Sequence, residues 1–250
     1  MAKERLDVLM VEKGLAESRE LAQRLIMAGE VTVDGQPAPK PGHKVDVLVE
    51  VAVRAPPRFV SRGGEKLEEA FRVFGCDVTG LTCLDVGAST GGFTDCLLQH
   101  GAAAVYAVDV GTGQLHWKLQ RDKRVVRMDD MNARYLKPGD FPRLLDFAVV
   151  DVAFISLTKI LPAVIEVIKA GAGIVTLIKP QFEAGREQIA RGGVVKDPAI
   201  REQVVDNIMK FGTANLGLEW LGVCESPIKG PAGNVEFLAR WRKPDREDMK

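Results

Sequence analysis

Four charged residues, far apart in the sequence, lie beside apolar stretches in which an isolated charge is unfavourable. Asp151 and Lys179 each end an apolar run, and Glu236 lies between two apolar residues. Lys66 falls in the first turn of a predicted helix, where a cation is mildly unfavourable without an anionic partner. Charges in such settings tend to be paired, although scattered charges are more often surface decoration. We therefore predict that these four side chains gather at one site, where lysines and carboxylates could move a proton.

A glycine-bearing turn at residues 87–92 follows a short apolar strand and precedes a helix that begins near residue 93. Glycines permit a tight turn and a close approach of the backbone to a ligand, and the helix directs its free amides toward that turn. The spacing G-x-x-x-G-G differs from the G-x-G-x-x-G of dinucleotide-binding loops. Asp85, just before the turn, suits a cationic or hydroxyl-rich ligand better than a phosphate. A plain structural turn is the alternative. The candidate cofactor contacts here are Asp85, Gly87, Ser89, Gly91, Gly92 and Phe93.

Further apolar runs read as strands buried on both faces, as a parallel sheet requires. They cover residues 105–110, 124–128, 147–151 and 173–179, with helices predicted at 157–169 and 199–214. The last two strands, 218–223 and 235–241, are separated by no helix, so they should be antiparallel. The pattern predicts a mostly parallel seven-stranded sheet with one reversed strand. Ligands of such sheets bind at the carboxyl ends of the strands, where Asp85, Asp109, Asp151 and Lys179 all fall.

Two more cofactor contacts are predicted beyond the glycine turn. Asp109 ends the second strand, and its two acceptor oxygens suit the vicinal diol of a ribose. Asp129 could accept a hydrogen bond from an adenine amino group while Met131 packs on the ring, or this segment could be a solvated turn. His116 and Trp117 are interpreted as packing residues on the intervening helix.

Residues 5–50 form a separate module. Leu6, Leu9 and Met10 are at helical spacing, and Ser18 can cap a second helix that ends at Gly29. Alternating residues 31–33, the turn signal Asp34-Gly35 and a second alternating stretch at residues 45–51 predict a hairpin.

Composition narrows the class of protein. The 250 residues are 46% hydrophobic and 27% charged, which is ordinary for a globular protein. Their net charge is zero, so the protein lacks the overall positive charge that would attract nucleic acid. The first residues are charged where a signal peptide needs an apolar core, and the longest run of apolar residues and glycine, 170–178, is too short to span a membrane. We therefore expect a cytoplasmic protein without a membrane partner.

Four cysteines without C-x-x-C spacing and three histidines predict reduced thiols and no metal site.

Residues 3–243 resemble the TlyA (hemolysin A) family of ribosomal RNA methyltransferases. The matching motifs are R-L-D-V-L, S-R-E-L-A-Q-R-L-I-M-A-G-E-V-T-V-D-G, S-R-G-G-E-K-L, L-D-V-G-A-S-T-G-G-F-T-D, V-D-V-G, D-V-A-F-I-S, I-K-P-Q-F-E and S-P-I-K-G-P-A-G-N-V-E. The resemblance implies an α/β, Rossmann-like seven-stranded class I methyltransferase fold of the FtsJ-like type, preceded by a small α+β S4-like RNA-binding domain. It implies an S4-like domain at 1–54, a linker at 55–60, the methyltransferase domain at 61–243 and a polar tail at 244–250.

The resemblance also implies the chemistry. Such proteins use S-adenosyl-L-methionine to methylate a ribose 2'-hydroxyl of ribosomal RNA, here of a cytidine, so the expected partners are ribosomal RNA or ribosomal subunits. Lys66, Asp151, Lys179 and Glu236 match the catalytic tetrad of the family. The candidate RNA contacts are Arg5, Arg19, Arg24 and Arg62, with Arg186, Arg191 and Lys196 as either further guides or ordinary loop charges.

Lys179 is the expected general base. A free lysine, with a pKa of about 10.4, is mostly protonated. Burial and the nearby Lys66 ammonium would favour the neutral amine, whereas Asp151 and Glu236 would oppose it. The direction of the net effect is left open, and much of the rate gain is expected from alignment of the hydroxyl, methyl and sulfur.

Three alternatives compete with ribose methylation. A base methyltransferase would favour an Asn/Asp-Pro-Pro-aromatic sequence where this chain has Asp151-Val-Ala-Phe154. A non-catalytic RNA-binding or ribosome assembly factor would have no need of the intact glycine turn. A pore-forming hemolysin would need a membrane-active segment that the sequence lacks. The oligomeric state and the target nucleotide's position stay open.

Overall fold

The computed structural model describes residues 3–54 and 58–245. The chain divides into two compact units, and the division falls between Arg58 and Phe59 in the sequence. Residues 55–57 of the expected linker and 246–250 of the expected tail lie outside the described residues. Phe59 is 5% exposed and belongs to the core of the larger unit. The larger unit therefore includes the last residues of the predicted linker.

The smaller unit packs two helices on two small sheets. The helices are α1 (Leu6–Glu12) and α2 (Arg19–Met27), and the Ser18 Oγ caps α2 by accepting a hydrogen bond from the Leu21 N–H. The first sheet has the order β3-β2-β5, formed by β2 (Val31–Val33), β3 (Gln36–Pro37) and β5 (Val51–Val53). The second pairs β1 (Lys3–Arg5) with β4 (Lys44–Asp46). Leu6, Met10, Ala22 and Ile26 fill the shared core.

The alternating stretch at 45–51 was predicted as one strand, and this prediction is wrong. β4 ends at Asp46 and β5 begins at Val51. The Asp46 side chain accepts a hydrogen bond from the Leu48 N–H and so turns the chain between the two strands. Since β4 pairs with β1 and β5 pairs with β2, the two halves of the stretch join different sheets.

The larger unit is built on a seven-stranded sheet with the order β11-β12-β10-β9-β6-β7-β8. Its strands are β6 (Thr82–Val86), β7 (Ala104–Val108), β8 (Val125–Met128), β9 (Leu145–Val150), β10 (Ile168–Ile178), β11 (Glu219–Glu225) and β12 (Phe237–Arg242). Only β12 runs antiparallel to its neighbours β10 and β11. The predicted mostly parallel sheet with one reversed strand is confirmed.

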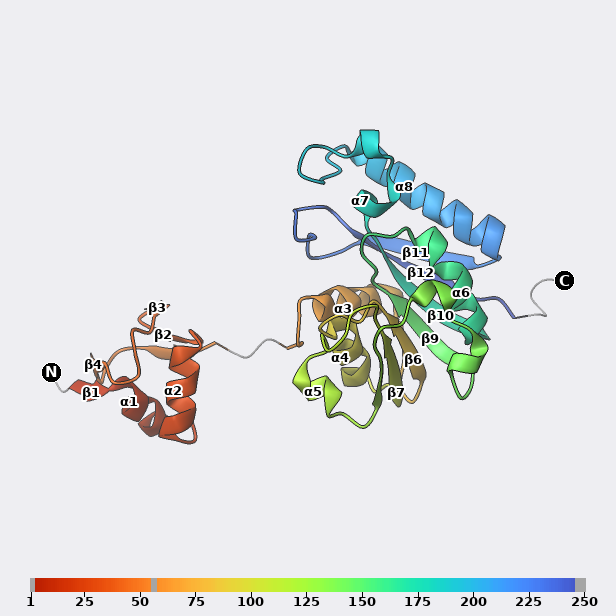
Figure 1. Cartoon of the computed structure of the whole chain (residues 1–250). Helices are drawn as coiled ribbons and strands as arrows, with labels where there is room; N and C mark the ends of the chain where they lie inside the picture. The colour runs from red at the N-terminus through yellow and green to blue at the C-terminus, as the bar shows by residue number, and fades with distance from the viewer. Residues whose placement is uncertain (1–2, 55–57, 246–250) are drawn as a thin grey trace. The chain divides into compact units, whose positions relative to one another are not determined.

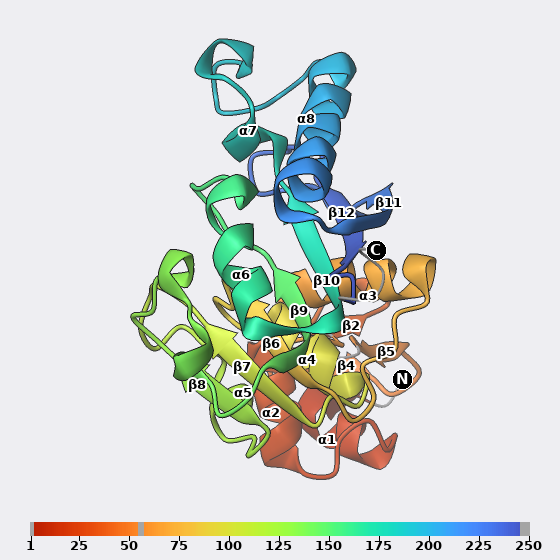
Figure 2. The ribbon, with the colours of Figure 1, turned by 90° about the vertical axis from the view of Figure 1, so that its right-hand side faces the viewer.

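Helices cover both faces of this sheet. One face is packed by α3 (Gly63–Phe74), α4 (Gly92–Gln99) and the short α5 (Trp117–Gln120), and the other by α6 (Leu161–Val167) and α8 (Pro198–Lys210) (Figure 1). β10 leads directly into the short helix α7 (Pro180–Glu183), which contacts α8 (Figure 2). Single turns lie at Ala133–Tyr135, Pro138–Asp140, Leu157–Lys159 and Arg186–Gln188, and a π-helix at Phe211–Asn215 extends α8.

Three local predictions in this unit are wrong. Trp117 is 57% exposed rather than packed, because it lies in the first turn of a one-turn helix too short to bury it. The helix predicted through residue 169 ends at Val167, where β10 begins. Glu236 precedes β12 instead of lying within it, so its side chain is not fixed by the alternation of the strand.

Two glycines allow the backbone to pack closely at the carboxyl edge of the sheet. Gly87 has a φ of 82°, and a Cβ there would clash with the Asp151 carbonyl group. At Gly92 a Cβ would clash with the Ser61 Oγ and the Gly64 nitrogen. These contacts bring α3 against α4 and place the glycine turn beside the end of β9.

Candidate active site

All four predicted tetrad residues line one cavity of about 310 Å³ at the carboxyl edge of the sheet. They come from four places in the chain. Lys66 is on α3, Asp151 follows β9, Lys179 follows β10, and Glu236 precedes β12. Parallel strands direct their carboxyl ends to one edge, so residues far apart in the sequence become neighbours there.

The four charges form two ion pairs. The Lys66 Nζ lies 2.5 Å from Glu236 Oε2, and the Lys179 Nζ lies 2.5 Å from Asp151 Oδ1. The first pair is the more buried, with 10% and 1% of the two side chains exposed, against 13% and 20% in the second. Among the described residues Asp151 Oδ1 has no aligned hydrogen bond. This oxygen is buried against the Lys179 ammonium, so a hydroxyl that enters the cavity would meet the Lys179–Asp151 pair.

Two residues that the sequence reasoning did not single out support these pairs. The Gln181 Nε2 donates to Glu236 Oε1 over 3.3 Å. Glu183 accepts hydrogen bonds from the Ser156 Oγ and the Leu157 N–H, and burial raises the pKa of its carboxyl. Glu183 therefore ties the loop after β9 to the helix after β10. The signal was present in Lys-Pro-Gln-Phe-Glu, where polar residues recur within one helical turn after Lys179.

A second cavity of about 480 Å³ adjoins the first and shares Gly87, Ser89 and Asp151 with it. Apolar side chains line much of it, including Val108, Met131, Ile155 and Ile160. Asp109 supplies a carboxylate at its wall. An apolar hollow with a few polar groups is typical of a site for a nucleoside-sized ligand.

The Asp109 carboxylate is held by two backbone donors. Its Oδ2 accepts from the Ser89 N–H over 2.8 Å, and its Oδ1 accepts from the Gly111 N–H over 2.7 Å. These bonds fix the carboxylate against the glycine turn, and each oxygen keeps a second lone pair for a ligand hydroxyl.

The other predicted cofactor contacts do not all line the larger cavity. Gly92 and Phe93 line the smaller cavity rather than the larger one. Gly91 packs against Leu115 and Leu119 and lines neither. Asp129 also lines neither: it accepts from the Gly113 N–H over 3.0 Å and pairs with Arg127 at 3.1 Å.

Asp85 lies behind the glycine turn, fully buried, and lines neither cavity. The Thr94 Oγ1 donates to its Oδ2 over 2.6 Å, while its Oδ1 has no hydrogen-bond partner among the described residues. Burial, opposed by the hydrogen bond from Thr94 and assisted by the charges of Asp151 and Asp109, raises the pKa of Asp85 to about 7. Thr94 was missed in the sequence, although it stands in the motif that follows the turn.

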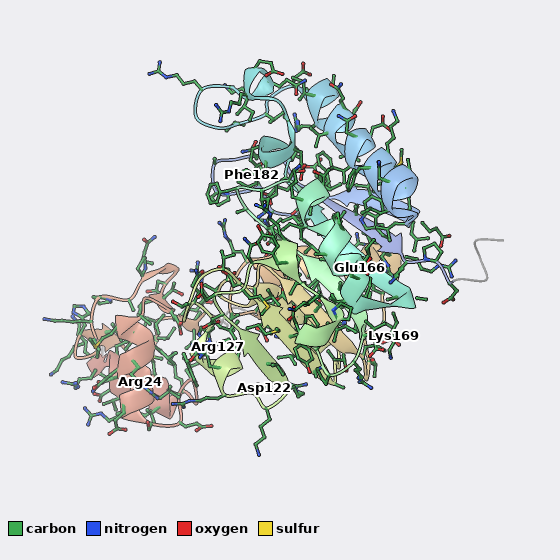
Figure 3. The ribbon with its side chains drawn as sticks, turned by 45° about the vertical axis from the view of Figure 1, so that its right-hand side comes forward. Arg24, Asp122, Arg127, Glu166, Lys169 and Phe182 are labelled. Carbon is green, nitrogen blue, oxygen red and sulfur yellow. The ribbon has the colours of Figure 1, made fainter. Side chains whose placement is uncertain are left out.

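The candidate RNA contacts differ in their surroundings. Arg62 is exposed and lines the smaller cavity. Arg24 is exposed on α2 (Figure 3). Arg5 donates two hydrogen bonds to the buried carboxylate of Asp7, and Arg19 lies 3.4 Å from the same carboxylate. Arg5 and Arg19 thus contribute to the structure of the smaller unit as well as to its surface. Arg186, Arg191 and Lys196 are exposed in the segment between α7 and α8.

The Asp7 network predicts a pH dependence for the smaller unit. Hydrogen bonds from Arg5, and further bonds from Gln23 and Arg19, hold the pKa of the Asp7 carboxyl well below its usual range. The stabilisation is therefore complete above the ordinary pKa of about 3.9 and is lost as the pH falls toward the folded value. The protection of the amides of residues 3–54 against exchange, relative to the intrinsic rate at each pH, should fall in wild type between about pH 4 and pH 2. Asp7→Asn should exchange faster already at neutral pH, and Glu12→Gln, an exposed control, should match wild type.

Equal acid sensitivity of Asp7→Asn and wild type, with equal protection at neutral pH, would show that this network does not stabilise the unit.

Within residues 3–54 and 58–245, no helix has the length and apolar character needed to cross a membrane.

Comparison with known proteins matches each unit to a protein family. Residues 59–243 match the model of the FtsJ-like methyltransferase family, and residues 4–51 match that of the S4 domain. Mycobacterium tuberculosis has a relative named 16S/23S rRNA (cytidine-2'-O)-methyltransferase TlyA, 46% identical over 94% of this chain and 88% of its own. Hemolysin A of Brachyspira hyodysenteriae is 44% identical over 95% of this chain and 99% of its own. A solved structure from Streptococcus thermophilus, 49% identical, covers 98% of this chain and 90% of its own with a TM-score of 0.75.

Proposed function

This chain belongs to the FtsJ-like methyltransferase family and carries an S4 domain, and from this we propose that it methylates a ribose 2'-hydroxyl of ribosomal RNA. The main support for the proposal is the arrangement of two ion pairs, Lys66–Glu236 and Lys179–Asp151, around the smaller cavity. This cavity adjoins the larger one, which has the size of a nucleoside. A 2'-hydroxyl is a weak nucleophile, so a site that orients it and accepts its proton is what this reaction requires.

The proposed methyl donor is S-adenosyl-L-methionine, which supplies an electrophilic methyl group on a positively charged sulfur. The larger cavity fits it, because Asp109 can accept from ribose hydroxyls and Met131 can pack on an adenine ring. The unpartnered oxygen of the buried Asp85 carboxylate also favours a cationic ligand nearby. Gly87 and Ser89, which line both cavities, would lie at the boundary between donor and acceptor.

The proposed role of Asp85 predicts a pH dependence of cofactor affinity. A cationic ligand favours the ionised carboxylate, whose pKa in the free protein is about 7. Affinity for S-adenosyl-L-methionine should therefore rise between about pH 6 and pH 8, by up to about tenfold in total, because the ionised fraction of Asp85 grows by that factor over this range. Asp85→Asn should lose most of this rise, whereas the surface variant Asp206→Asn should keep it. Calorimetric titration measures both, and identical profiles for wild type and Asp85→Asn would exclude this role for Asp85.

In the proposed mechanism Lys179 accepts the hydroxyl proton in its neutral form, and Asp151 stabilises the ammonium that results. The Lys66 ammonium, fixed by Glu236, faces the same cavity and can position the hydroxyl. Asp151 also holds the Lys179 Nζ at the cavity, where the hydroxyl oxygen can approach the methyl group. Orientation in a partly enclosed cavity should provide a large share of the rate.

The S4 domain and the rRNA-modifying relative support an RNA substrate, and the name of that relative suggests a cytidine as the target. We propose that ribosomal RNA, free or within a ribosomal subunit, is bound by both units and that the protein therefore acts in the cytoplasm. Arg24 on α2 and Arg62 at the cavity are the proposed phosphate contacts. Double-stranded RNA is recognised largely through phosphate and 2'-hydroxyl groups, which suits such arginines.

Incubation with labelled S-adenosyl-L-methionine and ribosomal subunits that lack the modification tests the proposal. Because a methylated ribose blocks alkaline cleavage beside it, the label should remain in alkali-resistant dinucleotides. Label in mononucleotides would indicate a base methyltransferase. Absence of both label and cofactor binding would indicate a non-catalytic RNA-binding factor.

A further inference from the structure

Three side chains that can bind a metal ion gather where α3 packs against α4. Glu68 comes from α3, Cys96 from α4, and His100 from the residue that ends α4. Glu68 Oε2 lies 2.7 Å from His100 Nε2 and 3.8 Å from Cys96 Sγ, and the three candidate ligand atoms all lie within 4.8 Å of one another. None of the three residues lines either cavity of the active site.

We propose that Glu68, Cys96 and His100 form a binding site for a divalent transition metal ion, with Zn²⁺ as the best match. A thiolate, an imidazole and a carboxylate are the three ligand types that zinc takes in proteins. Mg²⁺ and Ca²⁺ prefer oxygen ligands throughout, so the sulfur and nitrogen donors disfavour them. Three protein ligands leave the fourth tetrahedral position to water.

The geometry needs only small side-chain movements. Metal–ligand bonds of about 2.0 to 2.3 Å in a tetrahedron place neighbouring ligand atoms about 3.3 to 3.8 Å apart. The Cys96–Glu68 separation of 3.8 Å already has this length, the His100–Glu68 hydrogen bond must open, and no separation exceeds 4.8 Å. The ring of His100 meets the edge of Phe71 at a centroid distance of 4.8 Å, which restricts its orientation.

Burial and charge also suit a metal ion. The Cys96 residue is fully buried, whereas the side chains of His100 and Glu68 are 31% and 30% exposed, so an ion can enter from their side. A thiolate and a carboxylate balance the two positive charges of the ion, and the imidazole binds in its neutral form. Binding releases the thiol proton to solvent, so affinity should increase with pH.

The site would join the two helices that border the active site. Glu68 is two residues from Lys66 on α3, and Cys96 is two residues from Thr94, which holds Asp85. An ion bound to both helices would therefore stabilise the position of Lys66 relative to the glycine turn. It would act through structure, because it lies outside the cavities in which methyl transfer is proposed.

Titration of the full chain with Co²⁺, without an affinity tag and after removal of metals by a chelator, tests the proposal. We expect a cobalt–thiolate charge-transfer band and tetrahedral d–d bands that saturate at a single equivalent and disappear when Zn²⁺ is added. Cys96→Ser should lose the charge-transfer band, and Cys224→Ser, a control at a half-buried cysteine on β11, should keep it. Zn²⁺ should raise the Tm of wild type but not that of Cys96→Ser.

Glu68→Gln and His100→Gln provide a second test if Cys96→Ser does not fold, because both side chains are partly exposed. Each should weaken Co²⁺ binding by about 100-fold or more without a change in circular dichroism. Absence of the charge-transfer band in wild type, or unchanged affinity in both variants, would overturn the assignment. The spectrum is independent of methyl transfer, so the outcome does not depend on the proposed function.

Discussion

Replacing Lys179 with alanine is expected to lower the rate of methyl transfer to ribosomal RNA by about 10² to 10⁴-fold, the range typical for loss of a general base. The cofactor cavity does not include Lys179, so affinity for S-adenosyl-L-methionine should stay close to that of wild type. Lys179→Arg should be as inactive as Lys179→Ala, because a guanidinium stays protonated and cannot accept the hydroxyl proton.

Single-turnover transfer of labelled methyl groups, with saturating RNA, separates this loss of chemistry from a loss of binding. Lys210→Ala is a suitable control, because Lys210 forms an exposed pair with Asp206 on α8, where no catalytic role is proposed. Near-normal transfer by Lys179→Ala would refute the assignment of the base. A loss confined to cofactor affinity would assign Lys179 to binding instead.

Replacing Glu236 with alanine is expected to lower the free energy of unfolding by about 3 to 5 kcal/mol, because it leaves the buried Lys66 ammonium without its partner. Both side chains are nearly inaccessible to solvent, so water cannot replace the lost carboxylate. The double variant Lys66→Met/Glu236→Leu removes both charges and should recover most of this stability. Neither variant should transfer methyl groups, since both lose the fixed Lys66 ammonium that is proposed to position the hydroxyl.

Denaturant unfolding measures these differences. Glu219→Ala is the matched control: its pair with Arg242 has 42% and 39% of the two side chains exposed, and the expected loss is about 1 kcal/mol or less. If Glu236→Ala were no less stable than Glu219→Ala, the Lys66–Glu236 pair would not be the buried contact described above. Full activity in the double variant would remove both residues from the mechanism.

The seven-stranded sheet could be predicted because its evidence is local and repeated. Each strand is a short apolar run, and the missing helix between the last two strands specifies the reversed one. In the smaller unit the same reasoning was wrong at 45–51, since alternation cannot show that Asp46 turns the chain between two sheets. Trp117 was misplaced because an aromatic residue on a predicted helix was taken to be covered by neighbours that a one-turn helix does not have.

The four charged residues of the site could be named from their apolar surroundings, but their pairing could not. The sequence led us to expect that the Lys66 ammonium acts on Lys179. In the structure each lysine forms an ion pair with its own carboxylate. Such pairing depends on which loops approach in space. For the same reason Glu68, Cys96 and His100 were missed: Cys96 and His100 are one helical turn apart, but Glu68 comes from another helix.

The most direct test of ribose methylation is the identity of the methylated nucleoside. RNA methylated by the purified protein can be digested to nucleosides, which are then separated and fragmented in a mass spectrometer. The masses of the sugar and base fragments are measured separately. The proposed function predicts a cytidine whose added methyl group remains with the sugar fragment. A methyl group found on the base fragment would contradict the assignment of Lys66, Asp151, Lys179 and Glu236 to a ribose hydroxyl.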